Sequence, residues 1–140
     1  MKGGKTRRAG MLLGMTLLLL AACTRNHPGL VGDASDDEIN ANPSSYKSDI
    51  LAAMHSYLND PTAIRDAAIS QPALKSTGNI TRYIVCLQFN PKKNASEYAG
   101  VKTIAAVFLV GRFDHFVDTP KEECAGVTYT PFPELQKLPP

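Results

Sequence analysis

The chain has 140 residues, of which 44% are hydrophobic and 20% charged, and this length and composition fit one small globular domain with short flanking segments. Four of its 15 Lys and Arg residues lie within the first eight positions, which leaves 11 basic against 13 acidic residues in the rest. This mildly acidic balance excludes an electrostatic case for nucleic-acid binding, so we expect no nucleic-acid partner.

The first 22 residues have the pattern of a secretory signal peptide. Four basic residues precede an apolar stretch from Met11 to Ala22, which is interrupted only by Gly14 and Thr16. That stretch is shorter than the roughly 20 apolar residues that a membrane-spanning helix needs. We therefore expect residues 1–22 to be removed as an export signal.

Leu20-Ala21-Ala22-Cys23 ends this stretch and is similar to the lipobox of bacterial lipoproteins. The resemblance implies that the Cys23 thiol receives a diacylglycerol, that cleavage makes Cys23 the first mature residue, and that its amine takes a further acyl chain such as palmitate. Two or more acyl chains hold a protein stably on a membrane. Because Thr24 is not an aspartate, the resemblance favours the periplasmic face of the outer membrane. The alternative is an ordinary cleaved signal beside an unmodified Cys23.

Polar and small residues dominate the segment that follows Cys23. We expect residues 23–45 to form a flexible tether and residues 46–138 to form one small domain. The acidic run Asp36-Asp37-Glu38 has two interpretations, a cation- or partner-binding site and a solvated cluster of linker charges.

The first part of the domain has helical periodicity. Five apolar residues fall on one face of a first helix, namely Ile50, Leu51, Met54, Tyr57 and Leu58. Asp60 can cap a second short helix with Pro61 at its first position. That helix would continue to Ile69 and end before Pro72.

The second part of the domain alternates in the manner of β-strands. From Thr81 to Phe89 the odd-numbered residues form an apolar face and the even-numbered residues a mixed one, whereas Lys102 to Val110 is apolar on both faces. Gly111-Arg112 then has the form of a hairpin turn, Phe113 to Val117 runs back, and Val127 to Tyr129 adds an edge strand. This order predicts an α+β domain of two layers, with one or two N-terminal helices packed on a small antiparallel sheet of three to four strands.

Two cysteines remain once Cys23 is acylated. Cys86 and Cys124 form an even pair in a compartment that oxidises thiols, so we expect a disulfide between them. Closing a loop of about 38 residues would stabilise the domain by about 4 kcal/mol in the chain-entropy model. The alternative, a reactive or metal-binding cysteine, lacks a Cys-x-x-Cys spacing or a nearby histidine.

Leu58-Asn59-Asp60-Pro61-Thr62, the run from Tyr83 to Asn94, and Glu97-Tyr98-Ala99-Gly100 carry a further resemblance. They are similar to a pattern of small exported bacterial proteins, in which Leu-x-Asp-Pro-Ser precedes Val-Cys-x-x-Val-Asn-Ala-Lys-Asn-x-x-Gly-Gly-Tyr-x-Gly. Pro91 and Ser96-Glu97 depart from that pattern. The resemblance supports the predicted export and fold, and it implies no reaction.

The loop between the first two predicted strands is the best candidate interaction site. Asn90 and Asn94 can satisfy the turn backbone, Lys92 and Lys93 project positive charge, and Tyr98 is an aromatic residue of the kind enriched at interface hot spots. The alternative is that this loop only joins two strands, with Tyr98 packed back onto the sheet.

No pattern in the sequence predicts catalysis, a cofactor or a metal. Adjacent strand residues point to opposite faces, so Asp114 is not expected to orient His115, and the three histidines have no metal-ligand spacing. We therefore expect a non-enzymatic interaction or structural accessory domain whose partner is an envelope protein or cell-wall material. The alternative is a small-ligand-binding protein or hydrolase with a pocket between the helices and the sheet.

Overall fold

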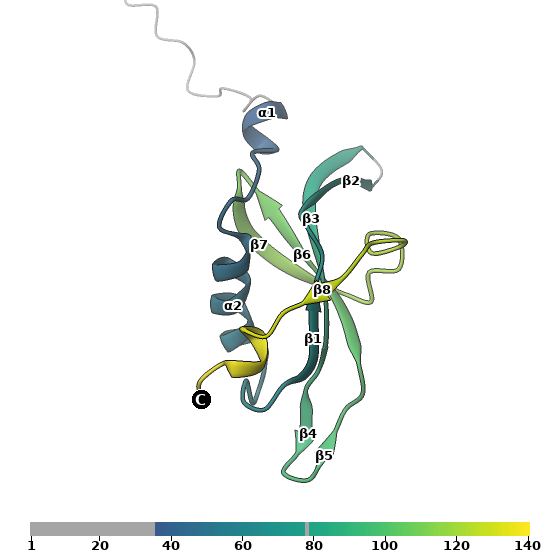
Figure 1. Cartoon of the computed structure of the whole chain (residues 1–140). Coiled ribbons are helices and arrows are strands. Elements are labelled where there is room, and N and C mark those ends of the chain that lie inside the picture. Colours follow the sequence, from purple (N-terminus) through teal and green to yellow (C-terminus); the bar gives the residue numbers. More distant parts are fainter. Residues whose placement is uncertain (1–35, 78) are drawn as a thin grey trace, which may run out of the picture. The chain divides into compact units, whose positions relative to one another are not determined.

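The computed structural model describes residues 36–77 and 79–140, which form an antiparallel sheet with one long helix on one face (Figure 1). A single helical turn, α1 (Asp36–Ile39), precedes the long helix α2 (Tyr46–Tyr57). The strands are β1 (Arg65–Ile69), β2 (Ala73–Thr77), β3 (Ile80–Asn90), β4 (Lys92–Asn94), β5 (Glu97–Tyr98), β6 (Lys102–Leu109), β7 (Arg112–Asp118) and β8 (Thr130–Pro131), and a 3-10 turn, η1 (Leu135–Lys137), follows. None of the helices in these two ranges is long and apolar enough to cross a membrane.

Six strands form one sheet: five follow the order β7-β6-β3-β1-β8, and the sixth, β2, also pairs with β3. Strands β4 and β5 pair separately as a small hairpin. The central strand β3 pairs with β6 along one edge. Its 11 residues are long enough for two shorter strands to share the other edge, with β1 along its second half and β2 along its first half. The register places Ile69 opposite Leu87 and Ala73 opposite Ile84.

The predicted α+β class is wrong, because the domain is mostly β. One long helix lies on a six-stranded sheet, against the three to four strands that were predicted, and the second predicted helix is the strand β1. Ala63 and Asp66 have φ values of 54° and 53°, in the left-handed region that an α-helix cannot contain. Beyond them Ala67 and Ile69 alternate into the core and β1 pairs with β3. The alanine-rich stretch therefore has the period of a strand.

The inner face of the sheet, which is the face that α2 covers, carries the larger core. Ile50 and Met54 of α2 are fully buried against alternate residues of β3, including Val85, Leu87 and Phe89, as the predicted apolar faces of the first helix and first strand require. Fully burying a side chain of this size stabilises the fold by about 1.5–3 kcal/mol. The helix is thus held by its packing on the sheet.

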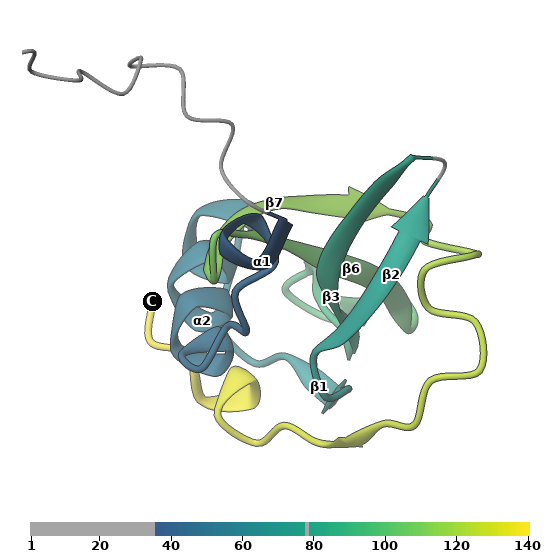
Figure 2. The same ribbon diagram turned by 90° about the horizontal axis from the view of Figure 1, so that it is seen from above.

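The outer face of the sheet is covered by the loop between β7 and β8, as Figure 2 shows on the side away from α2. The predicted disulfide between Cys86 in β3 and Cys124 in this loop is present, with a Cα–Cα distance of 5.7 Å. Val127 and Tyr129 of the same loop pack beside it on a second, smaller cluster of buried residues. The disulfide therefore fastens the loop to the middle of the sheet.

Ser70 marks the point at which one edge of β3 passes from β1 to β2. It is the only buried polar residue in the described part of the chain. Its N–H donates to the Cys86 carbonyl at 2.9 Å, and its Oγ accepts the Cys86 N–H at 2.9 Å in place of a backbone carbonyl. The side chain thus continues the ladder where the backbone of the edge strand turns away.

The last hairpin turn and the last strand lie beside their predicted positions. Leu109 pairs with Arg112, so the turn residues are Val110 and Gly111, with φ values of 53° and 70°. These positive angles at both central positions are those of a type I′ turn. The final strand is Thr130–Pro131 instead of residues 127–129, and it lies at the sheet edge, where a proline is tolerated.

Residues 36–45 belong to the predicted tether, yet they contact the domain. The Ile39 carbonyl accepts the Val110 N–H at 3.0 Å, and the Pro43 side chain is fully buried. A Cβ at Gly111 would lie 3.5 Å from the Ala41 Cβ, so the two chain segments run close together. The predicted signal peptide and the lipidation site Cys23 lie outside the described residues.

Candidate functional site

The antiparallel strands run between two opposite ends of the domain, which we call the α1 end and the β4–β5 end (Figure 1). The α1 end consists of α1, the tip of the β2–β3 hairpin and the β6–β7 turn. The β4–β5 end consists of the β4–β5 hairpin, the end of α2, the start of β6 and the loop that leaves β7. The two ends are about 35 Å apart, because β3 has 11 residues and a strand rises about 3.3 Å per residue.

The predicted interaction loop is the β4–β5 hairpin, and its asparagines hold it together. Asn94 Oδ1 accepts the Ser96 N–H at 3.1 Å across the turn, and Asn90 Oδ1 accepts the Gly100 N–H at 3.0 Å at the base of the hairpin. Lys93 lies 3.4 Å from Glu97 in an exposed ion pair. Asn90, Asn94 and Lys93 therefore have structural partners within the hairpin or at its base.

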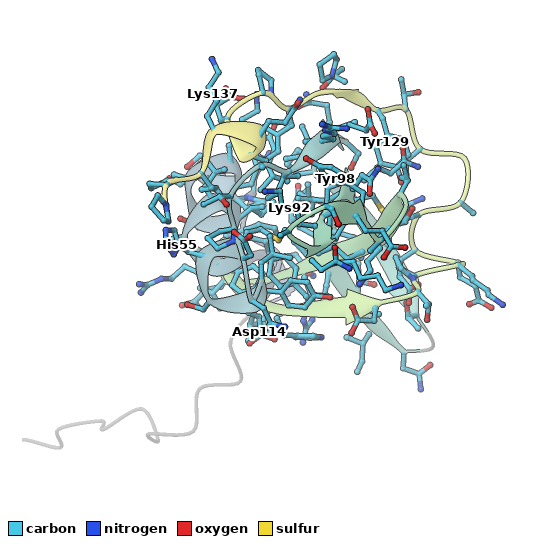
Figure 3. All side chains as sticks on the ribbon, turned by 90° about the horizontal axis from the view of Figure 1, so that it is seen from below. His55, Lys92, Tyr98, Asp114, Tyr129 and Lys137 are labelled. Carbon is cyan, nitrogen blue, oxygen red and sulfur yellow. A yellow bond between two sulfur atoms is a disulfide. The ribbon has the colours of Figure 1, made fainter. Side chains whose placement is uncertain are left out.

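Tyr98 packs back onto the sheet, as the alternative interpretation of the loop requires. The Arg65 guanidinium of β1 lies 4.1 Å from the centre of the Tyr98 ring, a cation–π contact that ties the hairpin to the edge of the sheet. Lys92 pairs across the hairpin with Tyr98, and Figure 3 shows both residues near the centre of the β4–β5 end. Tyr98 is thus an internal support of the site.

A basic cavity of about 650 Å³ separates the hairpin from the end of α2. Three lysines line it, Lys92, Lys93 and Lys102, and Asp60 is the acidic residue among them. The hydroxyl and N–H of Thr62 donate to Asp60 and lower the pKa of its carboxyl, with a smaller contribution from the Lys92 charge. Asp60 is therefore ionised, and it balances only part of the lysine charge.

A larger loop cavity of about 860 Å³ lies where the loop leaves β7 and crosses the outer face. Its polar lining includes Gln88, Thr103, Asp118 and Tyr129, and its apolar lining includes Val127. Burial raises the pKa of the Tyr129 hydroxyl, so this group stays protonated as a donor at neutral pH. A lining of this kind suits a ligand with both polar and apolar parts.

Tyr57 and Lys102 line both cavities. Tyr57 lies in the last turn of α2, where its hydroxyl donates to Asp118 at the end of β7. Burial, together with this hydrogen bond and the nearby carboxylate charge, raises the pKa of Tyr57 to about 12. The ring also contacts Phe116, with centroids 4.9 Å apart. Tyr57 therefore forms a fixed wall between the two cavities.

Asp114 and His115 do contact each other, which corrects the expectation that they point apart. A β-bulge lies between the Val107–His115 and Phe108–Phe113 pairs, so Asp114 is an extra residue on β7. The break in alternation brings Asp114 Oδ2 to 2.8 Å from His115 Nδ1. Both side chains are exposed, and neither lines the two cavities described above.

One part of the candidate site was named as a prediction from the sequence and the other was not. The lysines of the hairpin were predicted, whereas the loop cavity was not. The sequence contains only a weak sign of the loop cavity, namely the polar residues Gln88 and Thr103 on an outer face that is otherwise largely apolar. These two residues lie opposite each other in the register of β3 and β6. Within residues 36–77 and 79–140, no three His, Cys, Asp or Glu residues are grouped so that they could hold a metal ion.

Comparisons with known proteins add no family to this description. No protein-family model, curated protein or solved structure matches the chain. What the β4–β5 end can bind therefore follows from the chemistry of its own residues.

Proposed function

We propose that the chain is a lipid-anchored protein of the bacterial cell envelope whose domain binds a partner, without catalysis, through its β4–β5 end. One observation carries this proposal. The chain that follows Cys23 enters the domain at the α1 end, whereas the two larger cavities, with Tyr57 and Lys102 between them, lie at the opposite end. An anchored domain built in this way presents its binding surface away from its attachment.

The lipobox resemblance and the disulfide support the envelope location together. Disulfides persist in the periplasm and outside the cell and are rare in the reducing cytosol. Cys86 and Cys124 are bonded, which leaves Cys23 as the remaining cysteine of the three in the chain. The periplasmic face of the outer membrane is the location we propose for the mature protein.

The β4–β5 end favours a partner that carries carboxylate groups next to apolar surface. Lys92 and Lys102 are charged groups at the rim of the basic cavity, and the exposed edge of Tyr57 adds aromatic surface beside them. Carboxylates are common on envelope proteins and on the peptides of the cell wall. An envelope protein or cell-wall material is accordingly the partner class that we propose.

The test is recovery of a partner from the native envelope. The acylated full chain is cross-linked in its own membranes and purified, and its partners are quantified by mass spectrometry. We expect Lys92→Ala with Lys102→Ala to reduce the recovered partner by about tenfold, in line with a loss of about 1.4 kcal/mol or more. The matched control is Lys137→Ala, because Lys137 is an exposed lysine on η1 outside both cavities (Figure 3). Equal recovery from both variants would contradict the proposed binding end.

The anchor has its own test. In the lipobox interpretation, Cys23→Ala prevents acylation, so the protein should keep its leader or leave the membrane fraction. Intact mass and membrane fractionation read out both changes. A variant that stays membrane-bound at the wild-type mass would refute the anchor.

A small-ligand-binding protein or hydrolase is the second candidate, and the loop cavity favours it. Its volume of about 860 Å³ lies within the range of small-molecule sites, and polar residues such as Gln88 and Thr103 line it together with apolar ones. Native mass spectrometry of the protein from its own envelope should then show a bound molecule that Thr103→Phe removes. Thr128→Phe is the control, because Thr128 is exposed in the same loop and does not line the cavity. A ligand-free wild-type protein would count against this candidate.

A further inference from the structure

The α1 end exposes three aliphatic residues around the point at which the chain enters the domain. Leu109 and Val110 at the β6–β7 turn are 37% and 45% exposed, and Ile80 at the tip of the β2–β3 hairpin is 58% exposed. Leu74 on β2 and Val101 at the other end are also exposed, but only the α1 end gathers three such residues on chain reversals. Exposed aliphatic residues that cluster at a turn are typical of a contact surface.

The chain from Cys23 reaches the domain beside these residues. The hydrogen bond between the Ile39 carbonyl and the Val110 N–H fixes the end of α1 against the β6–β7 turn. Residues 24–35 link Cys23 to α1, and even a fully extended link of this length spans at most about 45 Å. In the direction of the chain the α1 end is therefore the part of the domain nearest to an acyl chain on Cys23, and the β4–β5 end lies about a further strand length from it.

Val110 has a backbone conformation that its side chain disfavours. A φ of 53° is uncommon for any residue other than glycine and is a genuine outlier for a β-branched one. Asn-Gly is the pair that a type I′ turn favours, and here Val110 stands in front of Gly111. An aliphatic side chain at this exposed position costs stability in the free domain. We therefore expect the Val110 side chain to make a favourable contact outside the domain that offsets this cost.

We propose that the α1 end rests on the bilayer that holds the acyl chains of Cys23, with Val110, Leu109 and Ile80 at the level of the lipid headgroups. This inference rests on the lipid anchor proposed above. Once the protein is anchored, contact between domain and membrane is intramolecular, so a few partly inserted side chains suffice to orient it. The β4–β5 end then faces away from the membrane.

Charge contributes little to this contact. The basic residues Lys75, Arg82 and Arg112 lie on the strands that lead to the α1 end, and Glu38 of α1 and Asp114 of β7 add charges of the opposite sign. The contact is therefore apolar and depends little on salt, unlike the binding of a polybasic segment to anionic lipids.

The absence of tryptophan from the chain allows a direct test. Single Ile80→Trp and Ala95→Trp variants place one indole at each end, since Ala95 is exposed at the tip of the β4–β5 hairpin. The acylated full chains are reconstituted in vesicles of phosphatidylethanolamine and phosphatidylglycerol, with and without bromine on the acyl chains. We expect brominated lipid to quench Ile80→Trp about twofold more than Ala95→Trp, at low and high salt alike. Asn79→Trp replaces Ile80→Trp as the reporter if the latter does not fold.

A second variant separates membrane contact from stability. Val110→Asn relieves the backbone strain at the β6–β7 turn, so it should raise the thermal midpoint of the Ile80→Trp protein. Because it also removes an aliphatic side chain from the proposed contact, it should reduce the quenching by brominated lipid. Equal quenching at the two ends in an acylated, vesicle-bound protein would overturn the membrane contact and leave the anchor intact. An unmodified Cys23, with protein that does not float with vesicles, would instead refute the anchor on which the inference depends.

Discussion

The α1 end and the β4–β5 end are built from the same strands and differ in how their turns are stabilised. At the α1 end, a backbone hydrogen bond from Val110 to Ile39 holds the chain, and the side chains at the turn are aliphatic. At the β4–β5 end, asparagine side chains and the Arg65–Tyr98 contact hold the hairpin, and lysines line the surface. An antiparallel sheet can thus carry two chemically different ends without any change in its core.

Removal of the disulfide is expected to have the largest effect on the stability of the domain. The loop that it holds lines the cavity at the β4–β5 end. Cys86→Ala with Cys124→Ala should lower the free energy of unfolding by about 4 kcal/mol, because the 38-residue separation no longer limits the unfolded chain. Urea denaturation with matched oxidised and reduced wild-type protein measures the change. If the variant and the oxidised wild type unfold at the same urea concentration, the loop is held by its packing instead.

Substitution of Ser70 is expected to have the second-largest effect on stability. This residue lies where the edge of β3 passes from β1, near the β4–β5 end, to β2, near the α1 end. Ser70→Ala leaves the buried Cys86 N–H without its acceptor and should cost about 1–3 kcal/mol. Ser76→Ala is the control, since Ser76 is exposed and bonds only the Thr81 hydroxyl, and it should cost less than about 0.5 kcal/mol. Equal costs in thermal unfolding would show that the edge of β3 does not depend on the Ser70 hydroxyl.

The β6–β7 turn should respond with opposite signs at its two residues. Val110→Asn should stabilise the domain by about 1 kcal/mol, because asparagine tolerates a positive φ, and Gly111→Ala should destabilise it by a similar amount at a φ of 70°. Thermal denaturation of the two variants beside the wild type gives both signs. A loss of stability in Val110→Asn would show that the valine does not strain the turn.

The Arg65–Tyr98 contact should contribute less, and only at the β4–β5 end. Arg65→Ala removes the cation above the ring and should cost about 0.5–1 kcal/mol while loosening the hairpin. Arg112→Ala at the α1 end is the matched change of an exposed arginine. Amide exchange that rises equally in both hairpins, or in neither, would contradict a local role for Arg65.

The smallest effect on stability is expected from the ionisation of the Tyr57 hydroxyl at high pH. Its pKa is raised from 10.0 to about 12, so its contribution to stability is complete below pH 10 and is lost as the pH rises toward 12. Spectrophotometric titration of the five tyrosines should show a step near pH 12, and Tyr57→Phe should remove that step. Should the late step persist in Tyr57→Phe, Tyr129, whose pKa is also raised by burial, is its source.

Strands β3, β6 and β7 were predicted close to their observed positions, because their apolar residues follow the faces of a strand. The alternation of β3, the apolar faces of β6 and the pairing of Cys86 with Cys124 are visible in the sequence and present in the structure. The first helix was predicted for the same reason, since Ile50 and Met54 have helical spacing.

The errors occur where local patterns are ambiguous or where distant segments meet. The two alanines and the isoleucine of β1 fit a helix and a strand equally well, and the left-handed angles at Ala63 and Asp66 decide between them. The bulge that joins Asp114 to His115 depends on the register with β6, which no local pattern contains. The loop cavity likewise depends on the path of the chain after β7.

Strand β2 has no buried residue and is held to the sheet by its pairing with β3 alone. Local opening free energies are lowest where backbone hydrogen bonds are exposed and few apolar contacts are lost on opening. β2 should therefore detach and re-form while the rest of the sheet stays folded. Each such opening uncovers the backbone of β3 from Ile80 to Ile84, which is a segment to which another extended chain could pair.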